Sequence, residues 1–317
     1  AVRGCLATFL LRYRERIPAL GDLYPHLDTF QDAEELIGRV LNVVAATPHK
    51  IYLLIDEYDH FANRLLSAGE GTVYEAIVKK TGFVRTFYAT LKAGTRSGAV
   101  ARMFVTGVSP LMLDDLSSGF NIATHASMSP RLATLAGFTR GETERAVSEF
   151  LAARPHLAAH PSLGDKGALL ATLEEYYNGY RFSEDARERV FNSDMVLYFL
   201  REVDDRGRPP ANMLDRNVRT EYGHLARIGT LTGANLSERR ALLQTIVGEG
   251  HIRSEIIDQF GVKSVEDSRT HFLSLLYFLG MLTLGASPRS PYGYDLEIPN
   301  RVIRELQWEH LALMLEE

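Results

Sequence analysis

The chain has 317 residues, of which 45% are hydrophobic and 24% charged, and its formal net charge at pH 7 is −5. This length allows two domains and a substantial core, whereas the acidic balance excludes a globally basic nucleic-acid-binding surface. The single cysteine, Cys5, excludes an internal disulfide framework. No apolar run approaches the roughly 20 residues that cross a bilayer. We therefore predict a cytoplasmic protein with no membrane partner.

Two helical patterns precede the first strand pattern. Residues 1–17 mix apolar and basic side chains at a roughly helical period, and Pro18 marks their end. Asp32 precedes a second helix with one apolar face, which is formed by Ala33, Leu36, Ile37, Val40, Leu41 and Val44. Because the sequence starts inside a helical pattern at Ala1, we expect it to be a piece of a longer protein.

Residues 51–59, Ile-Tyr-Leu-Leu-Ile-Asp-Glu-Tyr-Asp, place three carboxylates directly after an apolar run. Five consecutive apolar residues predict a strand that is buried on both faces of a parallel sheet. Ligand sites in open α/β sheets lie outside the carboxyl ends of the strands. There Asp56 would hold Mg²⁺ and Glu57 would orient a water molecule against a phosphate. This is the pattern of a Walker B motif, and the alternative is a strand that happens to end in an acidic turn.

A second short strand is predicted at residues 101–107, Ala-Arg-Met-Phe-Val-Thr-Gly. In P-loop ATPases a neighbouring strand ends in a polar sensor residue that touches the attacking water or the γ-phosphate, and Thr106 is placed for that role. The alternative is that Thr106 only satisfies a backbone group at the strand end. Residues 122–129 are candidates for a third strand, and the loop at residues 107–122 is long enough to predict a functional role.

The other half of a nucleotide site is missing from the sequence. No Gly-x-x-x-x-Gly-Lys-[Ser/Thr] segment is present to cradle phosphates. The glycine-containing stretches at residues 69–71 and 94–98 contain no lysine and follow no buried strand. The sequence therefore predicts either a degenerate ATPase or a chain whose phosphate-binding segment lies before Ala1.

Helical patterns dominate from residue 129 onward and then give way to a hairpin. Thr139 and Glu142 form a capping-box pattern, and Asn192 precedes another helix. An apolar helix at residues 272–279 is followed by two strand patterns, at 281–284 and 294–298, and by a closing helix at 301–315.

The predicted fold class is α/β, in three parts. Residues 1–130 would form part of the parallel sheet of a P-loop NTPase of the ASCE or AAA-like type, without its N-terminal strand and Walker A motif. Residues 131–240 would form a helical lid region. Residues 241–317 would form a winged-helix-like region with a β-hairpin and the closing helix.

A series of short motifs follows in order along nearly the whole chain. They are Leu-Leu-Ile-Asp-Glu-Tyr-Asp-His-Phe-Ala-Asn at 53–63, Phe-Val-Thr-Gly-Val-Ser-Pro at 104–110, Ser-Gly-Phe-Asn at 118–121, Gly-Phe-Thr at 137–139, Tyr-Asn-Gly-Tyr-Arg-Phe at 177–182, Asn-Ser-Asp-Met at 192–195, Asn-Val-Arg-Thr at 217–220 and Ile-Pro-Asn at 298–300. The series resembles the predicted AAA-ATPase-like proteins of bacteria, and it is far more specific than any one motif.

The resemblance implies a P-loop ATPase domain, a helical middle region and a C-terminal PD-(D/E)XK-type nuclease-like domain. This chain would be the middle piece, with the family's Gly-Lys-Ser loop before Ala1 and the nuclease-like domain after Glu317. By position, Asp56 matches the Mg²⁺ carboxylate, Glu57 the catalytic glutamate and Thr106 the sensor.

The match assigns no role to Tyr58, Asp59, Asn121 or Arg181. Asp59 and Arg181 are nevertheless candidates for binding the nucleotide. Arg181 follows a rigid Asn-Gly turn that suits a phosphate or lid contact, and its alternative role is an ordinary ion pair. Arg131 would act as a trans-acting finger in a homo-oligomer.

We expect an ATP·Mg²⁺-dependent switch or ATPase that controls a nuclease-like domain, and we expect the fragment alone to be inactive. The expected partners are ATP, DNA or the nuclease-like domain of the same polypeptide, and a second copy of the chain. Two alternatives stay open. One is a non-catalytic nucleotide-binding or scaffold module that keeps an ATPase-like sheet, and the other is a DNA-binding module that acts through the winged-helix-like end.

Overall fold

The computed structural model describes residues 2–30, 32–67, 71–78, 82–110, 122–161, 163–216, 218, 236–261, 264–265 and 268–316. Asn121, the motif at 118–121 and most of the motif at 217–220 lie outside these residues, as does the loop at 111–121. Within the described residues, none of the helices combines the length and the apolar character needed to span a membrane.

The contacts divide the chain into two compact units. The first contains Ala1–Thr124 with Gln259–Gly261, and the second contains His125–Asp258 with Val262–Glu317. The second unit thus spans both the predicted lid region and the predicted winged-helix-like region.

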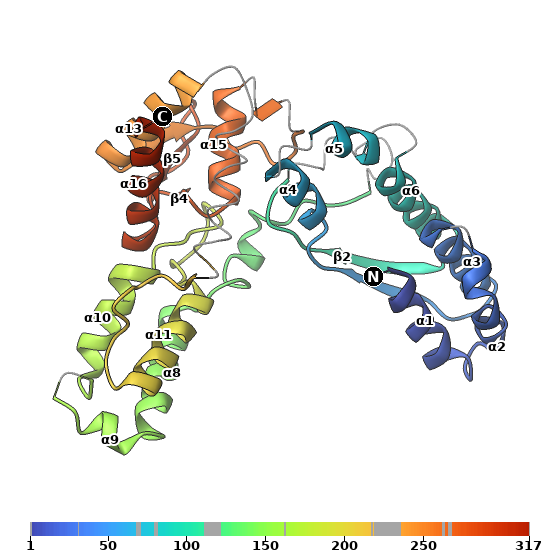
Figure 1. Cartoon of the computed structure of the whole chain (residues 1–317), viewed down its shortest axis with the longest axis horizontal. Helices are drawn as coiled ribbons and strands as arrows, with labels where there is room; N and C mark the ends of the chain where they lie inside the picture. Colours follow the sequence, from blue (N-terminus) through green and yellow to red (C-terminus); the bar gives the residue numbers. More distant parts are fainter. Residues whose placement is uncertain are drawn as a thin grey trace. The chain divides into compact units, whose positions relative to one another are not determined.

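The first unit combines helices with a small parallel sheet (Figure 1). Its elements are α1 (Val2–Tyr13), α2 (Pro18–Gly21), the 3₁₀ helix η1 (Tyr24–Thr29), α3 (Ala33–Ala45), β1 (Ile51–Ile55), α4 (His60–Ser67), α5 (Gly71–Val78), α6 (Phe83–Arg96) and β2 (Val100–Val105).

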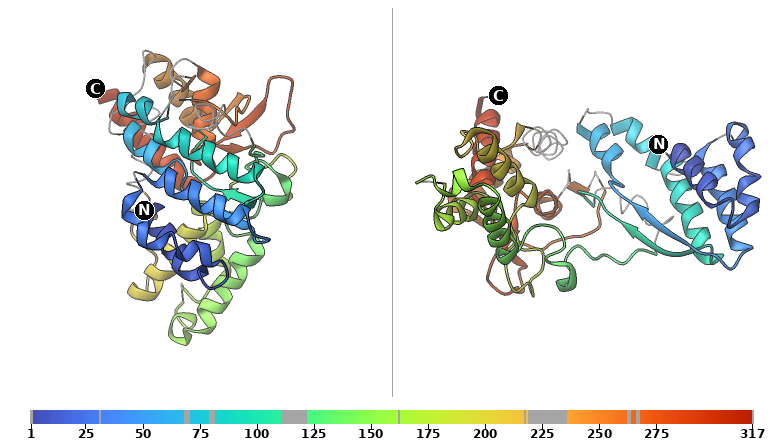
Figure 2. Two further views of the ribbon diagram at one scale, coloured as in Figure 1. Left: turned by 90° about the vertical axis from the view of Figure 1, so that its right-hand side faces the viewer. Right: turned by 90° about the horizontal axis from the view of Figure 1, so that it is seen from below.

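Helices α3 and α6 pack against each other and lie side by side in both views of Figure 2. The Asp32 side chain caps α3 by accepting a hydrogen bond of 2.8 Å from the Glu35 N–H. At Gly94 of α6, an added Cβ would lie 2.8 Å from the Leu41 side chain and 3.2 Å from that of Val100. The missing side chain at Gly94 therefore lets α6 approach both α3 and β2.

Strands β1 and β2 pair in parallel, with Leu53 opposite Met103 and Leu54 opposite Phe104. The prediction that β1 is buried on both faces is wrong, because the Tyr52 side chain is 63% exposed and that of Leu54 is 68% exposed. Phe104 lies on the same face and is also exposed. A run of five apolar residues predicts a strand but cannot tell one covered face from two, since coverage depends on distant elements.

The expected third strand at residues 122–129 is absent from the structure. Within that range, the backbone forms turns and extended segments, and Ser129 N–H donates to the Ala126 carbonyl at 3.0 Å. A strand needs a partner edge, and this segment pairs with none among the described strands.

The second unit is mostly helical. Its elements are the 3₁₀ helix η2 (Pro130–Leu132), α8 (Arg140–Ala152), α9 (Pro155–Ala158), α10 (Lys166–Tyr177), α11 (Ser193–Arg206), α13 (Leu236–Glu249), β3 (His251–Ser254), α15 (Arg269–Phe278), β4 (Thr283–Leu284), β5 (Tyr294–Glu297) and α16 (Arg301–Glu316). The capping box of Thr139 and Glu142 begins α8 as predicted, and the Asn192 side chain caps α11.

A three-stranded antiparallel sheet has the order β3-β5-β4. The predicted hairpin is confirmed as β4 and β5, with shorter strands than expected. Strand β3 was not predicted, because its four residues, with Ile252 as the one apolar side chain, are too few to show an alternation of apolar and polar residues. It pairs with the other edge of β5, with Ile252 opposite Leu296. Helix α13 packs against both β3 and α16.

Candidate functional site

The carboxyl ends of β1 and β2 bring Asp56–Asp59 next to Thr106–Ser109. The backbone pairing continues just past the strands, because Thr106 N–H donates to the Ile55 carbonyl at 2.8 Å and Tyr58 N–H donates to the Thr106 carbonyl at 3.0 Å. Both segments follow the same end of the parallel pair, as open α/β sheets require for a ligand site.

Asp56 and Thr106 are in direct contact. The Thr106 hydroxyl donates a hydrogen bond of 2.5 Å to Asp56 Oδ1 and lies 3.4 Å from the Ile55 carbonyl oxygen. The backbone N–H of Glu57 also donates to Asp56 Oδ1, at 3.0 Å. The Asp56 carboxylate remains exposed, so it is oriented by two donors and still accessible to a ligand.

Glu57 has a backbone φ of 53°, and it has the only positive φ found at a non-glycine residue in the described part of the chain. Such a conformation is uncommon outside glycine and costs of order 1 kcal/mol or more. The Glu57 side chain is exposed, and its Oε2 lies 3.5 Å from His60 Nδ1. The turn therefore presents the Glu57 carboxylate at the surface beside Asp56.

Asp59 is completely buried, in contrast to its two acidic neighbours. Its Oδ2 accepts from Ser109 N–H at 2.6 Å, Ser109 Oγ–H at 3.0 Å and Asn63 Nδ2–H at 2.7 Å, while Oδ1 accepts from Val108 N–H at 3.1 Å. The carboxylate thus joins the turn after β1 to the loop after β2.

Sequence reasoning missed Ser109 and Asn63 as partners of Asp59. The spacing of four residues between Asp59 and Asn63, at a helix start, was the available signal. Ser109 carried none, because nothing local links it to a residue 50 positions earlier.

Tyr58 and Tyr88 surround this buried charge. The Tyr58 hydroxyl donates to the Ser109 carbonyl oxygen at 2.5 Å. Burial, followed by the Asp59 charge, raises the pKa of Tyr58 above its ordinary value and that of Tyr88 to about 12. Gly107 makes this packing feasible, since a Cβ there would lie 2.3 Å from the Tyr58 ring and 2.5 Å from Asp59 Oδ1.

Arg181 and Arg131 belong to the second unit. The Arg181 guanidinium donates to the carbonyl oxygens of Gly285 at 3.0 Å and Glu184 at 2.5 Å. Its backbone is fixed to β4, because Arg181 N–H donates to Thr283 Oγ1 at 2.7 Å. Arg131 lies exposed in η2.

The residues at the strand ends fit a magnesium ion held by one carboxylate and water. Mg²⁺ is commonly bound through one or two carboxylates plus waters and substrate phosphates, and Asp56 supplies one exposed carboxylate. No group of three or more acidic, histidine or cysteine side chains with metal-binding geometry occurs in the described ranges.

One of three comparisons with known proteins found a match. Searches among curated proteins and among solved structures found no match to the chain. A family model with the description Predicted AAA-ATPase, of the AAA-ATPase-like type, matches residues 7–117, a range that includes Asp56, Glu57 and Thr106. The first unit is therefore similar to AAA-ATPase-like proteins, and this similarity suggests an ATPase-like function at the family level.

Proposed function

We propose that the first unit carries the acidic half of an ATP·Mg²⁺ site, in a switch protein that binds and hydrolyses ATP. In this proposal Asp56 holds Mg²⁺, Glu57 orients the attacking water, and Thr106 contacts that water or the γ-phosphate. The observation that carries it is the 2.5 Å hydrogen bond from Thr106 to Asp56 at the common end of two parallel strands.

Asp59 has a positioning role in this proposal. Asp59 is buried, and its carboxylate accepts four hydrogen bonds from protein donors. It therefore does not touch the nucleotide itself but holds the two loops that do.

For Arg181, contact with a phosphate would require its N–H groups to leave the carbonyls of Gly285 and Glu184. The nucleotide-binding role of Arg181 stays a prediction from the sequence.

The proposed site needs a phosphate-binding loop and further sheet strands. Parallel sheets in α/β proteins are usually covered on both faces, whereas Tyr52, Leu54 and Phe104 leave one face of the β1–β2 pair exposed and apolar. This supports the proposal that other segments of a P-loop ATPase domain cover this face of the sheet. Coupling to a nuclease-like domain, with the helical region acting as a lid, belongs to the same proposal.

The test is ATP hydrolysis by the intact protein, compared between the wild type and Glu57→Gln. The variant keeps the size of the side chain and removes the carboxylate that orients water. We expect hydrolysis to fall by about 10²-fold or more, with binding of labelled ATP retained. Glu15→Gln, at an exposed glutamate of the same unit, is the matched control and should leave the rate unchanged. Equal rates for wild type and Glu57→Gln would remove the catalytic assignment.

A scaffold role is the second candidate, and one observation favours it over DNA binding. The order α13, β3, α15, β4, β5 resembles a winged-helix arrangement, in which α15 would be the helix that enters a groove. However, six consecutive residues of α15, from Phe272 to Tyr277, are buried. We therefore propose that α15 supports the fold. DNA binding that weakens steeply between low and moderate salt would overturn this assignment.

A further inference from the structure

Strand β3 lies at the edge of its sheet among the strands that the structure describes. The sheet order β3-β5-β4 leaves one edge of β3 without a strand partner in the described part of the chain. Just before β3, Ile298 N–H donates to the Gly250 carbonyl at 3.1 Å. In an antiparallel pair, the residues that exchange hydrogen bonds alternate along the strand.

The register therefore fixes which backbone groups are free. Gly250 and Ile298 form a hydrogen-bonded pair, so the next residue of β3 whose backbone N–H and C=O groups face β5 is Ile252, opposite Leu296. The N–H and C=O groups of His251 and Arg253 point away from β5. Among the described residues, no hydrogen bond is found for these four groups. Both residues are exposed, so the groups are open to a partner strand.

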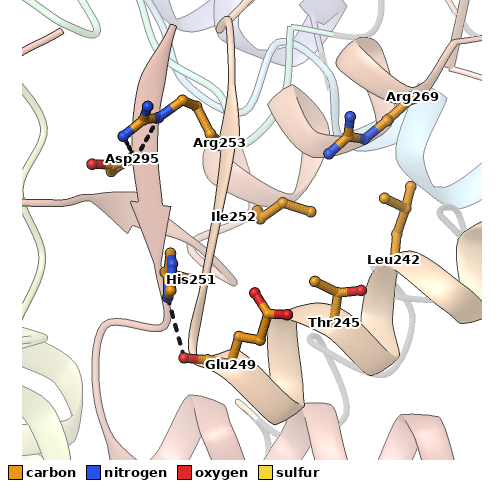
Figure 3. Close-up of a pocket in the computed structure, with 8 residues that line it drawn as sticks. All are labelled: Leu242, Thr245, Glu249, His251, Ile252, Arg253, Arg269 and Asp295. Carbon is orange, nitrogen blue, oxygen red and sulfur yellow. Dashed lines mark hydrogen bonds and ion pairs between the residues drawn. The ribbon is translucent and has the colours of Figure 1, made fainter. Parts of the chain in front are cut away.

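A hollow of about 370 Å³ lies along this edge (Figure 3). Helix α13 forms its wall with Leu242, Thr245 and Glu249, and Ile252 extends into it from β3. Arg269, the first residue of α15, enters from the end opposite Glu249. The hollow is therefore lined on one side by α13 and on the other by β3.

The charges around the hollow are separated along its length. The Arg253 side chain is already paired with Asp295, at 2.7 Å, and this hydrogen-bonded pair lowers the pKa of Asp295. Arg269 and Glu249 have no ion-pair partner among the residues that the structure describes. One end of the hollow thus carries an available cation and the other an available carboxylate, with apolar Leu242 and Ile252 between them.

We propose that this groove binds an extended peptide segment of a partner protein by β-strand addition. Main-chain hydrogen bonds would form with His251 and Arg253, as in other complexes in which a peptide adds a strand to a sheet edge. Side chains on one face of a strand alternate, so the peptide would present an acidic, an apolar and a basic residue at every second position. The acidic side chain meets Arg269, the apolar one meets Leu242 and Ile252, and the basic one meets Glu249.

The test uses a fluorescein-labelled peptide, Gly-Ser-Glu-Thr-Val-Thr-Lys-Ser-Gly, and the full chain without nucleotide. We expect saturable binding with a dissociation constant below about 1 mM. Binding should also slow hydrogen exchange at the amides of His251 and Arg253, while the Ile252 amide, already bonded to β5, changes little. Because ATP is absent, this result is independent of the proposed ATPase function.

Two matched variants separate main-chain from side-chain binding. Arg253→Ala and Arg253→Pro both remove the pair with Asp295, but only the proline removes the outward N–H. We expect Arg253→Pro to bind at least about fivefold more weakly than Arg253→Ala. Arg269→Glu should weaken the peptide about tenfold and transfer the preference to a peptide with lysine in place of glutamate.

Each contrary result has a defined meaning. No saturable binding up to about 1 mM, equal affinities of the alanine and proline variants, or no change of preference in Arg269→Glu would overturn the proposal. Competition by duplex DNA would assign the groove to nucleic acid instead. Self-association that Arg253→Pro abolishes would assign it to a second copy of the chain. If Arg253→Pro does not fold, the Arg269→Glu exchange and the amide protection still decide the question.

Discussion

Asp59 is the residue on which the geometry of the candidate site depends. Its carboxylate accepts hydrogen bonds from the backbones of Val108 and Ser109 and from the side chains of Ser109 and Asn63. A buried carboxylate of this kind is stabilised only while its donors remain in place. The two loops that carry Asp56 and Thr106 are thus held together by a third residue that is itself inaccessible.

Asp59→Asn should destabilise the first unit. The amide keeps one acceptor oxygen but turns an NH₂ group towards donors, and each buried unsatisfied donor costs about 1–3 kcal/mol. We expect a loss of at least about 2 kcal/mol in the free energy of unfolding, measured by urea denaturation with hydrogen exchange at the amides of Val108 and Ser109.

The matched control for that variant is Asp56→Asn, which makes the same charge change at an exposed carboxylate. Its free energy of unfolding should change by less than about 1 kcal/mol. If both variants lost the same stability, the hydrogen bonds of Asp59 would not be what holds the two loops.

At the scale of elements, local capping signals determine where the helices of the second unit begin. In α8 the Thr139 hydroxyl and the Glu142 carboxylate satisfy each other's backbone N–H groups. The Glu142 carboxylate accepts hydrogen bonds from both the backbone N–H and the hydroxyl of Thr139, and these two bonds lower the pKa of Glu142. The start of α8 thus carries a complete local cap, next to the long-range backbone bridge between Phe138 and Phe191.

Thr139→Ala should cost about 1 kcal/mol, because it removes the side chain that caps α8. Thr172→Ala is the control, since Thr172 lies within α10 and its hydroxyl only donates back to the Ala168 carbonyl. We expect the control to be neutral or slightly stabilising. Chemical denaturation of the two variants measures the difference, and equal midpoints would contradict a specific role for the cap.

At the scale of the whole molecule, buried and half-buried tyrosines in both units limit stability at high pH. Tyr58 and Tyr88 lie in the first unit, and Tyr177 and Tyr277 in the second. Burial is the main cause that raises the pKa of each of them, to about 12 for Tyr88. Three of the hydroxyls donate to backbone carbonyls, which a phenolate could not do.

The sign of the pH dependence follows from these raised pKa values. Above the ordinary tyrosine pKa of about 10, the unfolded chain loses protons that the folded chain keeps, so the free energy of unfolding falls as pH rises. The stabilisation is complete below pH 10 and is lost between pH 10 and the raised pKa values. We expect urea midpoints to stay constant up to about pH 10 and to fall steadily from there to about pH 12.

Tyr58→Phe provides the control for the pH dependence. The variant loses the hydrogen bond to Ser109 and is therefore less stable at neutral pH. It has one titrating group fewer, so the decline of the first unit above pH 10 should be shallower than in the wild type. A slope identical to that of the wild type would show that Tyr58 does not contribute to alkaline unfolding.

The sequence by itself determined the local elements and part of the candidate site. The cap residues and apolar faces predicted α3, α8 and α11, and the mixed α/β class with a small parallel sheet and a mostly helical region is confirmed. The sequence also predicted that Asp56 and Thr106 follow two neighbouring strands, whose ends lie at one edge of a parallel sheet. The hydrogen bond between them is a finding of the structure.

Only the tertiary structure decided which faces and edges are covered. The exposure of Tyr52 and Leu54, the burial of Asp59 against Ser109 and the position of β3 at the edge of the described sheet all depend on residues far away in the chain. Hydrophobic periodicity and capping are set within a few residues, whereas burial and strand pairing depend on which distant segments meet. A local pattern can therefore place a strand or a carboxylate in the chain, but it cannot say what lies against it.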